Sequence, residues 1–172
     1  MPLRKDYSGQ SCSLAKALEV VGERWTLLIV RDAFFGVRRF GDFADHLDIP
    51  RAVLSERLTS LVDAGVLERV DGDHGHVEYV LTDKGLALQP VLRSLLAWGD
   101  DYYSPKGPRR VFTHAADDGR IDRTGRCRSC GEPVPPGDTV VAPGPGLPSR
   151  PKPDRVSRTW TRPHRRLDPI PG

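Results

Sequence analysis

The stretch PRAVLSERLTSLVDAG, residues 50–65, decides the fold of this chain. Leu54, Leu58 and Leu61 recur at helical spacing and form one apolar stripe. Pro50 suits the first turn of a helix, where its missing N–H costs nothing, and Gly65 is typical of the position just beyond a helix end. The stretch therefore predicts an amphipathic helix that packs one face against a core.

The opposite face of this helix carries short side chains. Ala52, Ser55, Glu56 and Thr59 cluster there when positions are placed about 100° apart, and only Glu56 is charged. A solvated face more often carries long charged residues, whereas short side chains let a helix approach base edges in a major groove about 12 Å wide. The sequence thus predicts a DNA recognition helix.

The elements on either side follow from apolar spacing and helix-breaking residues. We expect helices over residues 11 or 13 to 22, 24 or 25 to 35, 40–47 and 83–103, the last capped by Thr82, and strands over 66–70 and 77–81 joined by a turn over 71–76. This order is that of a winged helix-turn-helix. The predicted fold class is mainly α with a small β-wing, followed by a loop-rich extension.

Charge and proline content divide the chain near residue 103. Residues 1–103 carry 12 basic and 16 acidic side chains, a net charge of −4, whereas residues 104–172 carry 14 basic and 7 acidic ones, a net charge of +7. Thirteen of the 16 prolines also follow residue 103. We expect a flexible N-terminus over 1–10, a DNA-binding and dimerisation domain over 11–103, a loop-rich extension over 104–140 and a disordered, Pro/Arg-rich tail over 141–172.

Composition argues against several classes of protein. No run approaches the roughly 18 apolar residues of a membrane-spanning helix, and the N-terminus lacks the apolar stretch of a secretory signal. Three cysteines are too few for a secreted disulfide framework and suit a reducing compartment. No nucleophile–base arrangement or phosphate-binding loop is present. We therefore expect a cytoplasmic, nucleoid-associated protein that is not an enzyme and has no membrane partner.

Longer motifs within residues 11–103 resemble one known family. They are Gly22-Glu-Arg-Trp-Thr-Leu-Leu-Ile-Val-Arg-Asp-Ala-Phe-Phe-Gly36, Arg38-Arg39-Phe40, Leu54-Ser-Glu-Arg-Leu58, Ala64-Gly-Val-Leu-Glu-Arg69 and Glu78-Tyr-Val-Leu-Thr-Asp-Lys-Gly85. In this order they are similar to the HxlR-type transcriptional regulators, which are relatives of the MarR family. The resemblance implies a bacterial, dimeric regulator of double-stranded DNA, and we expect a repressor that acts on a palindromic operator in or near its own operon.

The resemblance and the helix faces together predict the DNA-contacting residues. Arg38 and Arg39, at the entry of the helix-turn-helix, are expected to donate to phosphates, which position a protein without reading sequence. Arg51 can reach either a phosphate or a guanine edge. Arg57 is turned toward the helix flank, where an intramolecular ion pair competes with DNA contact. The full predicted set is Arg38, Arg39, Pro50, Arg51, Ala52, Ser55, Glu56, Arg57, Thr59 and, from an acidic wing, His76.

A homodimer is expected because the last helix carries more apolar residues than one small domain can cover. The resemblance adds the first helix to the interface. The predicted interface residues are Leu14, Leu18, Leu88, Leu92, Leu95, Trp98 and Tyr102.

Cys12 is a candidate redox sensor. It lies just before the first helix, where some members of the family that it resembles carry a thiol that senses quinones, aldehydes or oxidants. A helix N-terminus can lower the pKa of a thiol. The alternative is that Cys12 is a small apolar plug beneath the dimer interface, in which case the effector is another small molecule or none.

The turn Cys127-Arg-Ser-Cys130-Gly131 has the residue types of a zinc knuckle, in which two thiolates meet one metal. A structural site needs four ligands. Some HxlR-type proteins carry a C-terminal extension similar to a zinc ribbon, with an upstream His and Cys; His114 matches that His, whereas Asp117 or Asp118 stands near the place of the Cys. Residues 104–140 therefore resemble a degenerate zinc ribbon. Zinc is the candidate cofactor, held by His114, Cys127 and Cys130 with a carboxylate or water. The alternative is a remnant that binds no metal or a disulfide-prone cysteine pair.

Two other functions are alternatives to specific DNA recognition. A small redox or zinc protein would use Cys127 and Cys130, but disulfide exchange at such a pair is typical of a βαβ context, and residues 109–141 are rich in loops. A non-specific nucleic-acid binder would act through the basic tail and bind random sequence with equal affinity.

Overall fold

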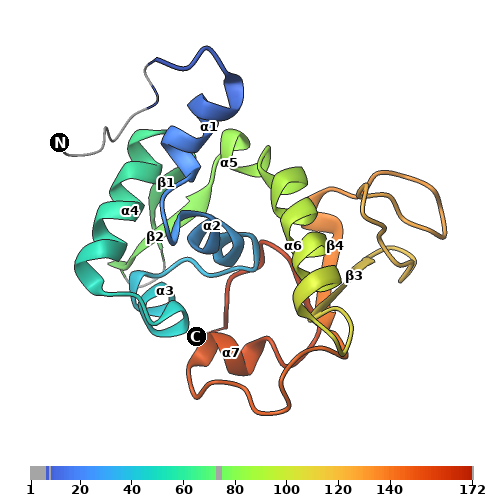
Figure 1. Cartoon of the computed structure of the whole chain (residues 1–172). Helices are drawn as coiled ribbons and strands as arrows, with labels where there is room; N and C mark the ends of the chain where they lie inside the picture. Colours follow the sequence, from blue (N-terminus) through green and yellow to red (C-terminus); the bar gives the residue numbers. More distant parts are fainter. Residues whose placement is uncertain (1–6, 8, 73–74, 172) are drawn as a thin grey trace.

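The computed structural model describes residues 7, 9–72 and 75–171, and its helices and strands up to residue 103 follow the order of a winged helix-turn-helix (Figure 1). The helices are α1 (Ser13–Val21), α2 (Thr26–Phe34), α3 (Phe40–Leu47), α4 (Arg51–Asp63), α5 (Asp83–Leu86), α6 (Gln89–Tyr103) and α7 (Arg155–Thr159). The strands are β1 (Leu67–Asp71), β2 (Val77–Leu81), β3 (Arg110–His114), β4 (Thr139–Pro143) and β5 (His164–Arg165). The predicted fold class is confirmed. The expected flexible N-terminus falls mostly outside the described residues.

Helix α2 forms the centre of the core (Figure 1). Ile29, Val30 and Phe34 are completely buried, as the nearly continuous apolar sequence of this helix predicts. Leu54 and Leu58 of α4 pack into the same cluster. The apolar stripe of the recognition helix is therefore the face that attaches it to the body of the domain.

The turn between α3 and α4 depends on two backbone conformations. Asp48 ends α3 with a left-handed φ of 54°, and Pro50 precedes the first residue of α4. Gly65, with φ 67°, follows α4 and lets the chain reverse into β1 without a Cβ clash. Strands β1 and β2 then pair antiparallel, with Leu67 opposite Leu81, and form the wing.

The single helix expected over 83–103 is two helices. Thr82 caps α5, and its Oγ1 accepts a hydrogen bond of 3.1 Å from the Gly85 N–H. The backbone then breaks before α6 because Pro90 has no N–H to continue the helical ladder. Pro90 instead occupies the first turn of a new helix, which is the position where proline is tolerated.

The extension and the C-terminal residues together form a second small sheet. Strands β3, β4 and β5 are antiparallel and lie in the order β3-β4-β5, with Phe112 opposite Val141. Residues 115–138 loop away from the end of β3 and return to it. Among the described residues no helix is long and apolar enough to cross a membrane.

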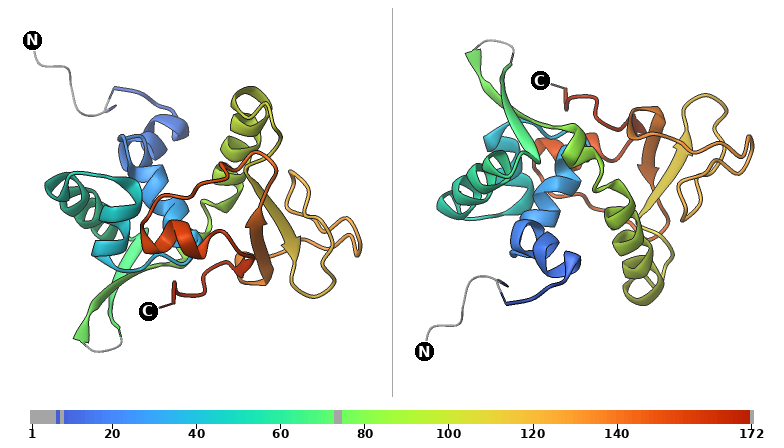
Figure 2. Two further views of the ribbon diagram at one scale, coloured as in Figure 1. Left: turned by 90° about the horizontal axis from the view of Figure 1, so that it is seen from below. Right: turned by 90° about the horizontal axis from the view of Figure 1, so that it is seen from above.

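The prediction of a disordered tail over 141–172 is wrong. Residues 144–171, the C-terminal segment, cross the face of the helical domain between α3 and β4 (Figure 2). Val156, Trp160 and Ile170 are at most 8% exposed and belong to the common core. Proline and arginine content suggested disorder, but these few apolar side chains find partners far away in sequence.

Backbone hydrogen bonds fix the end of this segment to the helical domain. The Leu167 N–H donates to the Phe34 carbonyl at 3.1 Å, and the Ile170 N–H donates to the Gly36 carbonyl at 3.0 Å. Gly36 has a φ of 90°, and a Cβ there would overlap with the Asp168 carbonyl oxygen. Glycine is therefore required where the C-terminal segment passes closest to the end of α2.

Candidate nucleic-acid interface and metal centre

The short-residue face of α4 is open to solvent. Leu54, Leu58 and Leu61 are at most 1% exposed on the inner side. The predicted contact residues on the outer side are all exposed, namely Pro50, Arg51, Ala52, Ser55, Glu56 and Thr59. The structure therefore leaves the predicted reading face of α4 exposed to solvent.

Arg51 stands at the first position of α4. Its guanidinium lies 5.6 Å from the centre of the Phe40 ring at the start of α3. Cation–aromatic contact of this kind restrains a long side chain without consuming its hydrogen-bond donors. Arg51 is thus held at the N-terminal end of the helix with its donors available.

Arg57 is engaged within the chain. It forms ion pairs with Glu23, at 3.6 Å, and with Glu56, and its side chain is only 15% exposed. Of the two roles that the sequence left open, the structure shows the intramolecular pair. Glu56 is consequently partly neutralised where it borders the reading face.

Arg38 and Arg39 converge on one carboxylate that sequence reasoning did not identify. Each guanidinium lies 3.6 Å from Glu78 of β2, and Arg38 Nη2 also donates to the Leu167 carbonyl at 2.8 Å. The sequence singled out Glu78 only as the first residue of the motif over 78–85. The register that places Arg39 opposite Glu78 is a long-range contact, so no local pattern signalled it.

The wing contributes one exposed candidate, His76, whose carbonyl accepts a hydrogen bond of 2.8 Å from the Gly72 N–H. Asp73 and His74 lie outside the described residues.

The tail is not a free polycation, because Arg155 pairs with Asp42 and Arg166 is only 4% exposed.

Exposed apolar side chains lie on both α1 and α6. Leu14, Leu18, Leu95, Trp98 and Tyr102 are between 37% and 70% exposed, as an unpartnered interface requires. Leu88 is half-buried. The prediction for Leu92 is wrong: this side chain is 6% exposed because it faces the chain's own core.

Cys12 lies immediately before the first residue of α1 and is exposed. The backbone N–H groups of Ala15 and Leu14 lower the pKa of its thiol. A thiol with a lowered pKa and free access is the reactive form of cysteine. Exposure and a lowered pKa are the two properties that the redox-sensing interpretation of Cys12 requires.

Four potential metal ligands meet beyond the end of β3. The donor atoms of His114, Asp117, Cys127 and Cys130 all lie within 4.8 Å of one another. The sequence left Asp117 and Asp118 open as the carboxylate, and Asp117 is the one that joins the cluster. A Cβ at Gly119 would overlap with the Cys127 sulfur, so glycine gives this thiol its place.

The distances within this cluster fit zinc. Cys127 Sγ lies 3.3 and 3.4 Å from the two Asp117 oxygens, and Cys130 Sγ lies 3.6 Å from His114 Nδ1. His114 Nδ1 lies 3.3 Å from Asp117 Oδ1. Tetrahedral ligands about 2.0–2.3 Å from Zn²⁺ are separated by roughly 3.3–3.8 Å. The donor set Cys₂-His-Asp and its spacing therefore suit a structural zinc ion.

One ligand of this cluster is already positioned as an anion. The Gly119 N–H donates to Asp117 Oδ1 at 2.9 Å and is the main cause of the lowered pKa of Asp117. An ionised carboxylate is the form that binds a metal.

The exposed recognition helix, the wing and the surrounding fold define the class of protein as a winged-helix, DNA-binding transcriptional regulator. The profile described as HxlR-like helix-turn-helix matches residues 20–107, and the chain belongs to this family.

Relatives of the chain are transcriptional regulators. Rv3095 of Mycobacterium tuberculosis, named an HTH-type transcriptional regulator, is 45% identical over 138 residues, which are 78% of this chain and 87% of the relative. YodB of Bacillus subtilis is 33% identical over 95 residues, 54% of this chain and 85% of YodB. The crystal structure of PA1607, described as a candidate transcription factor, is 38% identical, covers 86% of this chain and 99% of its own, and has a TM-score of 0.54.

Proposed function

We propose that the protein acts as a homodimeric repressor that reads a palindromic operator with the outer face of α4. The observation that carries this proposal is the exposed row of short side chains on α4. At the N-terminal end of this row, the Phe40 ring restrains the Arg51 side chain. The apolar surface of α1 and α6 supports the dimer. Relatives that are transcriptional regulators support a cytoplasmic, non-enzymatic role.

Arg38 and Arg39 act as positioning contacts in this proposal. Both are within reach of Glu78, so each phosphate contact must compete with this carboxylate. Base reading then depends on α4, where Arg51 is the residue with the donors for a guanine edge.

Operator binding should show two half-sites and one specificity residue. A dimer is expected to protect half-sites about 10 bp apart or a multiple of that in a footprint of its promoter region. Arg51→Ala should weaken the free energy of operator binding by about 1–3 kcal/mol and relax the preference at one base position. Arg39→Ala is the matched control and should weaken all sequences alike while flattening the salt dependence. Protection by a monomer, without a repeat, would contradict the proposal.

We also propose that oxidation of Cys12 releases DNA. Cys12 borders α1, which contributes to the proposed interface, so a modified thiol can displace both recognition helices. YodB has structures described as its reduced and quinone-bound forms; this describes YodB, and the proposal for this chain rests on the exposure and lowered pKa of Cys12.

Oxidant sensitivity should reside in Cys12. Mild oxidation is expected to lower operator affinity in the wild type and to leave the affinity of Cys12→Ser unchanged. The Cys127→Ser/Cys130→Ser double variant should remain sensitive, because its cysteines lie in the extension. Gel-shift titrations before and after oxidation measure the effect. Undiminished sensitivity in Cys12→Ser would refute the role of this thiol.

A further inference from the structure

A cavity of about 350 Å³ lies between α2, α6 and the start of β3, and we call it the α2–α6 cavity. This volume falls in the range of about 300–1,000 Å³ that is typical of small-molecule sites. Most of its wall is apolar. Leu27 and Leu28 come from α2, and Leu92, Leu95, Leu96 and Tyr103 come from α6.

Arginines line the same cavity. Arg31 Nε donates to Asp32 Oδ1 at 2.8 Å, whereas Arg110 donates to the Trp160 carbonyl at 2.6 Å. Among the described residues no carboxylate lies within 4 Å of the Arg110 guanidinium. Asp100 also lines the cavity, but its Oδ1 accepts a hydrogen bond from the backbone N–H of Arg109.

The charge of Arg110 is poorly compensated. Burial, together with the neighbouring charge of Arg31, lowers the pKa of Arg110 to about 10. Asp32, a buried carboxylate whose charge acts on Arg110, is already shared between Arg31 and His46. An anion placed at Arg110 would relieve the repulsion between the two guanidinium groups, and it would be held by charge-assisted hydrogen bonds.

We propose that the α2–α6 cavity binds a small organic monocarboxylic acid, with its carboxylate at Arg110 and Arg31 and its apolar body between α2 and α6. Apolar walls with a few converging polar groups are the general form of a ligand site. Charge complementarity selects an acid over a neutral molecule of the same shape.

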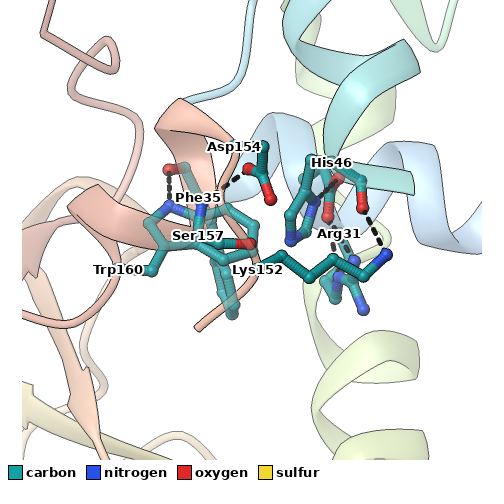
Figure 3. A network of polar contacts seen from close by, with 8 residues as sticks. Arg31, Phe35, His46, Lys152, Asp154, Ser157 and Trp160 are labelled. Carbon is teal, nitrogen blue, oxygen red and sulfur yellow. Dashed lines mark hydrogen bonds and ion pairs between the residues drawn. The ribbon is translucent and has the colours of Figure 1, made fainter. Parts of the chain in front are cut away.

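Both arginines connect this site to α3 of the helix-turn-helix. Arg110 lies 5.3 Å from the centre of the Trp160 ring, and Trp160 packs edge-on against His46 at 4.5 Å. Arg31 holds Asp32, which lies 2.6 Å from His46 Nδ1. Figure 3 shows Arg31, His46 and Trp160 in this network, with Lys152 and Asp154 of the C-terminal segment beside them.

A bound acid therefore competes for the two arginines that brace α3. Any effect on operator affinity rests on the proposed function. We expect the acid to lower operator affinity by about fivefold or more, as is usual for coupled sites. Acid binding itself does not depend on that function, so it is measured on the full-length protein without DNA.

Isothermal titration with phenylacetate and octanoate, compared with their primary amides, tests the site directly. Each acid should bind at least tenfold more tightly than its amide. Arg110→Met should abolish this preference. Because loss of Arg110 also removes its bond to Trp160, a second variant that fills the cavity is needed.

Gly99→Leu fills the α2–α6 cavity from α6. A Cβ at Gly99 meets no atom within 4 Å, and replacing glycine inside a helix does not strain the backbone. Ser94→Leu, exposed on the same helix and outside the cavity, is the control. Acid binding should weaken at least tenfold in Gly99→Leu and persist in Ser94→Leu.

Two results would overturn the proposal. One is equal binding of acid and amide, or none, by the wild-type protein. The other is equally tight acid binding by Gly99→Leu and by the wild-type protein, which would place the acid outside the α2–α6 cavity. Retained operator binding with either result would leave the proposed function intact.

Discussion

Trp160→Ala is expected to lower the free energy of unfolding by about 3–5 kcal/mol, which is the usual cost of removing a large buried aromatic side chain. Trp160 is 3% exposed and lies edge-on to Phe35 at 5.2 Å. Its indole N–H also donates to the Phe35 carbonyl at 3.3 Å. Urea denaturation followed by circular dichroism measures the change.

The matched control is Arg150→Ala, an exposed position in the same C-terminal segment. This change should alter the free energy of unfolding by less than about 0.5 kcal/mol. A loss below about 1 kcal/mol for Trp160→Ala would mean that the C-terminal segment contributes little to the core, contrary to its burial.

Zinc should copurify with the protein at about one equivalent per chain and fall below about 0.2 equivalents in Cys127→Ser, because a structural site holds its metal tightly. Cys127 is 1% exposed and contacts Asp117, so its loss removes a buried ligand of the cluster. Elemental analysis of samples prepared without added metal measures the content. Ser129→Ala, in the same turn, should retain the metal.

Loss of zinc should also expose the loops of the extension to trypsin. Arg123, Arg126 and Arg128 lie between the end of β3 and the cysteine pair or within that pair. Chelator treatment is expected to speed cleavage there while α2 and α4 remain protected. Wild-type protein with intact thiols and under about 0.2 equivalents of zinc would identify the cluster as a remnant that no longer binds metal.

Local sequence patterns predicted the DNA-binding domain over residues 11–103 well. The bounds expected for α3 match the structure, because Phe40, Phe43 and Leu47 lie at helical spacing and the turn follows at once. The outer face of α4 was predictable for the same reason. The break before α6 was missed because the apolar spacing continues across Pro90, whose backbone effect decides the boundary.

The C-terminal segment could not be predicted from composition. Its apolar residues are few, and Trp160 finds Phe35 across 125 positions of sequence. Such pairings carry no periodicity. The same limit explains the candidate sites: the pairing of Arg38 with Glu78 arises from strand register, and the choice of Asp117 over Asp118 arises from the turn at Gly119.

The hydrogen bonds from Leu167 and Ile170 to the end of α2 also constrain the order of events during synthesis. At about 5–20 residues per second, the ribosome delivers Trp160 many seconds after Phe35 has emerged. Until then the nascent DNA-binding domain lacks part of its core, and the apolar surface that Trp160 later covers is available to chaperones. A chain truncated before Trp160 is therefore expected to expose the apolar surface of Phe35 that this residue covers in the full chain.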